Sequence, residues 1–520
     1  MFLCQPLLDA LIGRGIVDVD SFLRLPSWND LPDPMSIPQM ENAAARVLRA
    51  VKERERITVH GDYDCDGVLG THILRSVLCS MGAQARAYLP HRDEGYGLGS
   101  RAVHLFSRSG TDLLITVDNG INAGRPIHLA RRLGIEVIVV DHHRIQEPAE
   151  ALALWSPEYC GAGVAALFAW ALALRAGWKS DRVERLLAAV SQYAALASIA
   201  DCVPLQYGTR TLARLGLEEL SRAKHCGLRE LLRIGCADPS HPDSYDIGFG
   251  VAPRINAAGR INHPDLALAV FAAAQDEAAA RERVEVLNQL NTERRKQVRE
   301  QFDELTRSLP NDPPAAIVAY REACPRGIAG LLASKCVERY SVPSLVLAPA
   351  PHPGFIVGSG RSVPGYDLVD GLNPFRELLT RFGGHAQAVG LTMPVEHIGT
   401  FERQFTKALE ELKLPRRFPV MADAQLSLAT TGRTLDEQLA SLEPFGEGNP
   451  APIFELREME VISTKNRRIR MRQGRHSLEV LCWDLSPDSG MRGDCLVEFR
   501  GKRRILREFR EQNSTHAWPV

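Results

Sequence analysis

Residues 57–67 read I-T-V-H-G-D-Y-D-C-D-G, an apolar run that ends in a dense group of acidic residues. An apolar run followed by aspartate returns at 113–118, L-L-I-T-V-D, and at 135–141, I-E-V-I-V-V-D. Short runs of this kind are typical of buried strands. Helix-like stretches at 70–81 and 121–133 lie between them, which predicts a parallel sheet with crossover helices. Ligands of such sheets bind at the carboxyl ends of the strands, where these aspartates fall.

The rest of the chain divides into further segments. An alanine- and leucine-rich region at 164–274 predicts helices that cover the sheet, and 276–309, free of Gly and Pro, predicts one long exposed helix. After several prolines, strand-like runs at 315–318 and 344–347 and Gly-rich turns at 354–360 predict a second α/β lobe. The tail from 415 has short alternating segments and many arginines, and it predicts a small β-rich domain.

Composition restricts the class of protein. With 520 residues, 45% hydrophobic and 24% charged, the chain has the make-up of a globular protein of several domains. The formal net charge of -1 gives no overall attraction to nucleic acid, so phosphate binding has to depend on local basic patches or bound cations. The longest apolar run, 164–174, is shorter than the ~18–20 residues of a membrane span. The start lacks the basic residues of a signal peptide, and the 11 cysteines form no CxxC pair. We therefore expect a cytoplasmic protein that does not enter a membrane.

The first acidic segment carries four candidate ligands at alternate positions, His60, Asp62, Asp64 and Asp66. In extended backbone, residues two apart point to the same side, so these side chains would converge before the chain turns. Adjacent carboxylates repel each other unless a cation neutralises them, which favours a metal site. The alternatives are a solvated acidic loop or an EF-hand-like calcium turn, although the last position of that motif is Ile73 instead of the required Glu.

Three other segments end in candidate ligands. Asp118 in T-V-D-N-G and Asp201 in A-D-C-V-P-L follow apolar runs, although each could by itself be a helix cap or terminus. His142 and His143, in V-D-H-H, directly follow a strand, where imidazoles are costly unless they are coordinated or are hydrogen-bonded core histidines. Together the four segments predict a centre for two ions, Mn²⁺ or Mg²⁺, that hydrolyses phosphate esters. In it, Asp118 would bridge the ions and His143 would contact the phosphate or donate a proton.

The motifs D-Y-D-C-D-G, T-V-D-N-G, V-D-H-H and A-D-C-V-P-L, in this order, resemble those of the DHH phosphoesterase superfamily. Further on, 253–260 (P-R-I-N-A-A-G-R), 358–362 (G-S-G-R-S) and 382–386 (F-G-G-H-A) resemble motifs of its RecJ-like single-strand-specific exonucleases. The segment 444–454, P-F-G-E-G-N-P-A-P-I-F, resembles the start of that family's OB-fold domain. The resemblance covers nearly the whole chain.

The resemblance implies an α/β fold: a parallel-sheet DHH domain and a second α/β (DHHA1) domain joined by the long helix, then a small β-rich OB-like domain. The expected parts are an N-terminal helical extension at 1–50, the DHH domain at 51–275, the connecting helix at 276–312, DHHA1 at 313–414 and the OB-like domain at 415–520.

It also implies roles for individual residues. Asp66, Asp118, His142 and Asp201 would hold one ion, and His60, Asp64 and Asp118 the other. His143 and the three aspartates of the first segment, Asp62, Asp64 and Asp66, would act in catalysis. The substrate would bind to residues of both lobes: Arg254, Asn256, Arg260, Ser359, Arg361, Gly383, Gly384 and His385. The alternatives are surface ion pairs for the arginines and a tight turn for the two glycines.

Together with the two-metal site, the resemblance implies a metal-dependent 5′ to 3′ exonuclease that degrades single-stranded DNA in repair and recombination, as a monomer working beside a helicase and a single-strand-binding protein. Two other functions stay open: a phosphodiesterase of short oligonucleotides or cyclic dinucleotides, and a non-catalytic replication scaffold. The retained acidic set argues against the scaffold, and the OB-like segment argues against the short substrates. Three departures from the family pattern are Cys324-Pro325 in place of Trp-His, a short stretch at 143–161, and an end soon after the OB-like region, so that no further C-terminal domain is expected.

Overall fold

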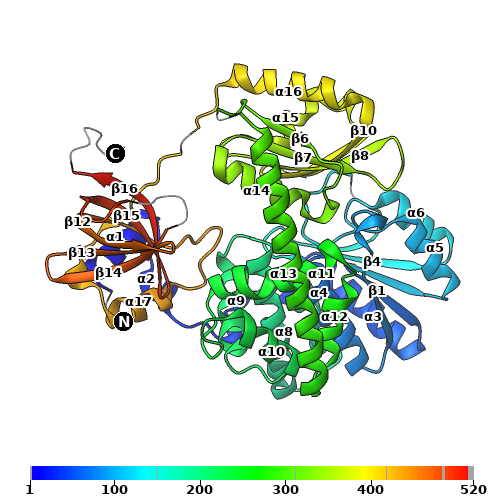
Figure 1. Cartoon of the computed structure of the whole chain (residues 1–520). Coiled ribbons are helices and arrows are strands. Elements are labelled where there is room, and N and C mark those ends of the chain that lie inside the picture. The colour runs from blue at the N-terminus through cyan, green and yellow to red at the C-terminus, as the bar shows by residue number, and fades with distance from the viewer. Residues whose placement is uncertain (1–2, 148, 311, 417, 483–486, 513–520) are drawn as a thin grey trace.

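A computed structural model describes residues 3–147, 149–310, 312–416, 418–482 and 487–512. It has three sheets, each with its own core, and one long helix that runs from the first part to the second (Figure 1). The predicted α/β fold with a β-rich C-terminal domain is confirmed. Among the described residues, no helix is both long enough and apolar enough to cross a bilayer.

The first sheet is wholly parallel, with strand order β2-β1-β3-β4-β5. Its strands are β1 (Arg56–His60), β2 (Gln84–Tyr88), β3 (Leu113–Val117), β4 (Glu136–Asp141) and β5 (Leu152–Trp155). The three strands predicted from the apolar runs are β1, β3 and β4. Alternate residues of β1 face opposite sides, so Ile57 and Val59 join one core while His60 lies toward the other.

Helices cover both faces of this sheet (Figure 1). One core holds α3 (Met40–Glu53), α4 (Cys65–Ser80) and α7 (Gly161–Arg175); the other holds α5 (Ser100–Arg108) and α6 (Gly124–Arg132). The apolar run at 164–174 lies within α7 and is almost entirely buried, which confirms a core helix in place of a membrane span.

A helical region follows, as predicted. It contains α8 (Ser180–Ala200), α9 (Tyr207–Leu220), α10 (Cys226–Gly235), the π-helical turn η4 (Asp246–Val251), α11 (Ala252–Ile261) and α12 (Asp265–Ala272). The predicted long helix at 276–309 is α13 (Glu277–Ser308), which begins at the cap Asp276.

The second lobe has the strand order β6-β7-β8-β10-β9. Its elements are β6 (Ile317–Tyr320), α14 (Ala329–Tyr340), β7 (Ser344–Pro349), β8 (Phe355–Arg361), α15 (Leu368–Leu372), β9 (Arg381–His385), β10 (Ala388–Pro394) and α16 (Ile398–Leu412). The predicted Gly-rich turn at 354–360 is wrong, because most of it is strand β8. Its glycines make room for neighbours: a Cβ at Gly358 would lie 2.4 Å from Leu347, and one at Gly360 would lie 2.7 Å from Val389.

The third sheet closes on itself, because β12 pairs with both β13 and β15. Its elements are β11 (Ala424–Gln425), α17 (Arg433–Leu442), β12 (Ile453–Lys465), β13 (Arg468–Gln473), β14 (His476–Leu481), β15 (Arg492–Arg500) and β16 (Arg503–Glu511). We call residues 418–512 the OB-like domain.

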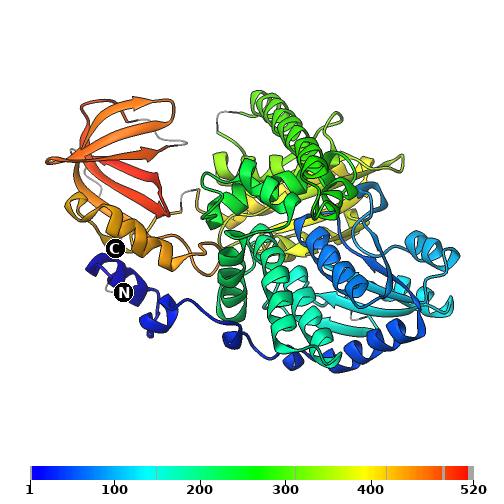
Figure 2. The ribbon, with the colours of Figure 1, turned by 90° about the horizontal axis from the view of Figure 1, so that it is seen from below.

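The N-terminal helices α1 (Gln5–Gly13) and α2 (Val19–Leu23) lie beside α17, and the chain runs from there along the first domain (Figure 2). Leu7 and Leu11 are buried in the core of the OB-like domain. Arg214 of α9 donates to the carbonyl oxygens of Phe22 and Arg24, at 3.0 and 2.9 Å. The N-terminal segment therefore ties the OB-like domain to the first domain.

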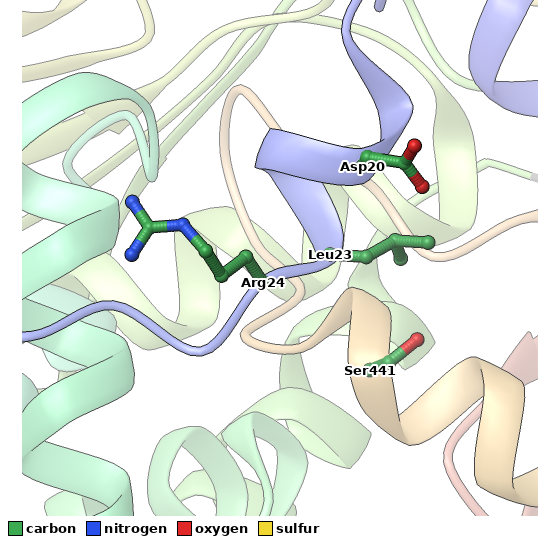
Figure 3. Close-up of a pocket in the computed structure, with 4 residues that line it drawn as sticks. All are labelled: Asp20, Leu23, Arg24 and Ser441. Carbon is green, nitrogen blue, oxygen red and sulfur yellow. The ribbon is translucent and has the colours of Figure 1, made fainter. Parts of the chain in front are cut away.

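A cavity of about 330 Å³ lies between α2 and α17, lined by Asp20, Leu23, Arg24 and Ser441 (Figure 3). None of the predicted site residues lines it. The chemistry has to be sought at the first sheet.

Candidate metal centre

The acidic segment after β1 is a tight loop that leads into a helix. α4 begins at Cys65, and Asp64 is its N-cap, accepting hydrogen bonds from the backbone N–H groups of Asp66 (3.0 Å) and Gly67 (3.1 Å). The expectation of extended backbone through Asp66 is therefore wrong. Gly67 is needed for the loop, because a Cβ there would lie 2.4 Å from the backbone nitrogen of Asp62.

His142 lies at the centre of the first candidate ligand group. Its Nε2 is 3.2 Å from Asp118 Oδ1, 3.5 Å from Asp201 Oδ2 and 3.7 Å from Asp66 Oδ2. Asp66 is held in place by the backbone N–H groups of Gly161 and Ala162, at 2.6 and 2.7 Å. Four residues from four separate segments, the set expected for one ion, thus meet at the carboxyl end of the sheet.

A second group consists of Asp62, Asp64 and Asp118, with one oxygen of each within 4.8 Å of the others. Asp118 also lies beside His142, so it can serve both groups. Its backbone is left-handed (φ 60°), and a Cβ at Gly161 would lie only 2.6 Å from the Asp118 Cβ. The turn after β3 and the glycine at the start of α7 together place the shared carboxylate.

Electrostatics favour a cation between these groups. Burial, with the charges of Asp66 and Asp64, raises the pKa of Asp118 well above its usual value. Burial and Asp64 do the same to the pKa of Asp62, whose Oδ1 has no hydrogen-bond partner among the described residues. Divalent ions would remove this repulsion, and a mixed carboxylate and imidazole set suits Mn²⁺. The residues present therefore fit the two expected ions.

His60 is set apart from the carboxylates. Its ring is fully buried on the other face of the sheet, with centroids 5.7 Å from the Tyr88 ring and 5.9 Å from the Phe106 ring. Burial lowers the pKa of His60 to about 4. β1 continues through His60, so strand alternation directs this side chain away from the carboxylates. In the second group, Asp62 takes the place that was expected for His60. The expected role of His60 as a ligand does not fit this arrangement.

His143 lies beside the first group, and hydrogen bonds to Asp141 and Tyr96 hold its imidazole ring in place. Its Nδ1 is 2.7 Å from Asp141 Oδ1, and its Nε2 is 2.8 Å from the hydroxyl oxygen of Tyr96, which donates to the carbonyl of Asp118. Burial alone would lower the pKa of His143, but the bond to Asp141 and the nearby carboxylates raise it to about 9. Sequence reasoning missed Asp141 and Tyr96; the position of Asp141, directly before the two histidines, was the available signal.

The three residues expected on α11 all hydrogen-bond to the protein itself, and Arg260 does so by donating to the carbonyl oxygen of Gly327 at 3.0 Å. Asn256 accepts a 2.7 Å hydrogen bond from the backbone N–H of Cys65, so it fixes the start of α4. Arg254 donates to the carbonyl oxygen of Gly250 at 2.6 Å.

Arg260 belongs to a group of cations. Burial and the neighbouring charges of Arg92, Arg294 and Arg361 lower its pKa to about 9. Arg92, which sequence reasoning missed, stacks over the Tyr63 ring at 3.9 Å. Guanidinium groups gathered in this way can bind an anion such as phosphate.

The second lobe closes over this region. Arg361 on β8 lies 3.2 Å from Ser359 Oγ, and the His385 ring on β9 stacks against His143 at 5.8 Å between centroids. Gly383 and Gly384 are part of strand β9, so the tight-turn alternative is wrong. A cavity of about 570 Å³ between the lobes is lined by Arg92 and Arg260 and also by Cys324 and Pro325, the replacement pair.

Comparisons with known proteins agree with this architecture. Residues 56–198 match the DHH family, N-terminal domain, and residues 422–496 match the RecJ OB domain. The single-stranded-DNA-specific exonuclease RecJ of Dickeya dadantii is 32% identical over 92% of this chain and 90% of the relative. That of Bacillus subtilis is 33% identical over 81% of this chain, which spans only 54% of the relative's length. The structure of RecJ with Mn²⁺ from Thermus thermophilus has a TM-score of 0.82 and 28% identity, covering 98% of this chain and 76% of that one.

Fold and site together define a DHH-type phosphoesterase that carries a second α/β lobe and an OB domain. Within that class, the chain belongs to the RecJ family.

Proposed function

We propose that the chain is a metal-dependent exonuclease that hydrolyses single-stranded DNA from its 5′ end. The observation that carries the proposal is the meeting of His142 with three carboxylates, one of which, Asp118, also belongs to a second acidic group. Relatives named as single-stranded-DNA-specific exonucleases, and a relative's structure with Mn²⁺, support the same activity. The set of ligands argues against a non-catalytic scaffold.

Candidate ligands for one ion are Asp66, Asp118, His142 and Asp201, and for the other Asp62, Asp64 and Asp118. Bound ions would stabilise negative charge on the scissile phosphate and lower the pKa of a water molecule, so that hydroxide is available as the nucleophile near neutral pH. His143, kept protonated by Asp141, can give its proton to the leaving oxygen. Arg260 and Arg361 would hold neighbouring phosphates in place.

The same architecture supports a preference for an unpaired strand. The cavity of about 570 Å³ between the lobes is in the size range of pockets that hold one small ligand, and Arg92 and Arg260 in its lining could bind the phosphate of an unpaired nucleotide. The OB-like domain would hold the strand further along. We place this activity in the cytoplasm, in DNA repair and recombination, with the chain as a monomer that works beside a helicase and a single-strand-binding protein.

Time courses on single strands labelled at either end, with and without Mn²⁺, test the proposal. Mononucleotides that carry the 5′ label should appear first, only with the metal, and a fully duplex blunt end should resist. Early release of the 3′ label would contradict the direction, and preference for oligomers of two to five nucleotides would favour a short-substrate phosphodiesterase.

A further inference from the structure

Phe249 is a solvent-exposed aromatic residue. It is 64% exposed and lies within the π-helical turn η4, which leads directly into α11. The backbone beneath it is firmly packed: a Cβ at Gly250 would lie 1.9 Å from the carbonyl oxygen of Gly235. The ring is thus presented by a rigid backbone, and π-helical turns are frequent at functional sites.

One face of this ring is already covered. The Tyr245 ring stacks on it, with centroids 4.5 Å apart and planes at 29°. Arg503, from β16 of the OB-like domain, lies over Tyr245 at 4.2 Å and is fixed by ion pairs with Asp243 (2.6 Å) and Asp246. A cation and two rings therefore form a stack across the junction of two domains, and the high exposure of Phe249 leaves its other face to solvent.

The turn η4 that carries the stack packs against α8, the helix that ends at Asp201, and the stack itself includes a residue of the OB-like domain. On one side, Gly248 approaches Ile199, two residues before the candidate ligand Asp201. Arg254, expected beside the phosphates, hydrogen-bonds to the carbonyl oxygen of Gly250 in the same turn. On the other side stands Arg503 of the OB-like domain.

We propose that Phe249 is a stacking site for one unpaired base of the strand that runs from the metal centre to the OB-like domain. This inference rests on the proposed function and adds a definite contact to it. Proteins commonly hold single strands by stacking bases on aromatic side chains, whatever the sequence. A base inside a duplex has no free face for such stacking. The cation behind Tyr245 keeps the platform ordered before the strand arrives.

Binding of a 20-nucleotide oligo(dT) in EDTA, which keeps the strand intact, tests the inference by fluorescence anisotropy. Phe249→Ala should weaken binding roughly tenfold, the size expected from losing one stacked base. Phe249→Trp should bind as tightly as the wild type, and Phe249→Leu, which keeps apolar bulk without a π face, should behave like the alanine variant. Phe355→Ala, at another exposed ring at the start of β8, is the matched control and should have no effect.

An abasic scan of the same strand then locates the base. At one position an abasic nucleotide should weaken binding to the wild type roughly tenfold and leave binding to Phe249→Ala unchanged, because the partner of the missing base is already gone. Equal affinity of Phe249→Leu and Phe249→Trp, or an abasic effect that persists in Phe249→Ala at every position, would overturn the stacking site. Failure of the wild type to bind the strand would overturn the proposed function as well, so the two failures are distinguishable.

Discussion

The backbone N–H of Leu205 donates a 2.7 Å hydrogen bond to the carbonyl oxygen of Glu447. Leu205 is four residues after the candidate ligand Asp201, and Glu447 belongs to the hairpin at 444–450 that leads into β12. Gly446 of that hairpin packs on Leu205 so closely that a Cβ would lie 2.8 Å from its Cδ1. The OB-like domain therefore supports the loop that carries a candidate metal ligand, in addition to any contact with DNA.

This support predicts a metal-binding defect from a change in the hairpin. Gly446→Val should push Leu205 away, shift the loop of Asp201 and raise the Mn²⁺ concentration for half-maximal cleavage about tenfold. Gly124→Val is the control, since an added Cβ at Gly124 meets nothing within 4 Å. An unchanged Mn²⁺ dependence in a folded Gly446→Val variant would show that the hairpin does not position the ligand.

Asp118→Asn should separate stability from function. The substitution removes a buried charge that Asp66 and Asp64 repel, so the Tm in EDTA should stay the same or rise. Cleavage should fall at least about a thousandfold. Mn²⁺ at a hundred times its Kd should stabilise the wild type by about 2.7 kcal/mol and the variant far less. Thermal unfolding with and without Mn²⁺ measures both effects, and a variant that is destabilised in EDTA but keeps its Mn²⁺ response would contradict them.

His143 and Asp141 should act as a pair in the chemical step. His143→Gln should lower kcat about a hundredfold with little change in Mn²⁺ affinity, because the proton donor is lost and the ligands stay. Asp141→Asn removes the 2.7 Å partner of His143 Nδ1 and should lower kcat in the same direction. The double variant should be no worse than His143→Gln alone. Additive losses in kcat would mean that the two residues act independently.

The junction with the OB-like domain should weaken as pH rises. Burial and the charge of Asp243 raise the pKa of Glu443 to about 7. The Glu443 carboxyl group accepts a 2.9 Å hydrogen bond from the backbone N–H of Phe445. Other charged groups also lie at the junction: Arg210 is near Glu443, Arg503 pairs with Asp243 and Asp246, and Lys502 lies 4.0 Å from Asp238. The folded protein holds this proton more tightly than the unfolded chain, so the stabilisation is fully present below pH ~4.3 and is lost as the pH passes through about 7.

Glu443→Gln should remove this contribution. The fall in unfolding free energy between pH 5.5 and pH 8 should be smaller in the variant than in the wild type, as measured by denaturant titration at both values. Identical pH slopes for the two proteins would argue against a raised pKa at Glu443.

Much of the architecture could be predicted because its signals are local. The apolar runs that became β1, β3 and β4 and the Gly- and Pro-free stretch that became α13 each carry their pattern within a few residues. The meeting of Asp66, Asp118 and His142 was also within reach, because strands of one parallel sheet end at the same edge. Asp201 ends helix α8 instead, and it was expected at the site from the family resemblance.

The features that could not be predicted from the sequence depend on the direction in which a side chain points. His60 and Asp62 are two residues apart, yet strand alternation buries one while the loop into α4 directs the other to the acidic group. In the sequence, the glycines of β8 resemble a turn. The residues that require them to be small, Leu347 and Val389, lie on other strands and are not visible in the local pattern. Arg92 and Tyr96 carry no motif of their own, and their place beside the site depends on the fold.

Diffraction from crystals soaked in Mn²⁺, recorded at the manganese absorption edge, tests the central claim most directly. The structure predicts two anomalous peaks about 3.5–4 Å apart. One should lie among Asp66, His142 and Asp201 and the other beside Asp62 and Asp64, with Asp118 touching both. A single peak, or a peak held by His60, would contradict the two-ion centre described for this chain.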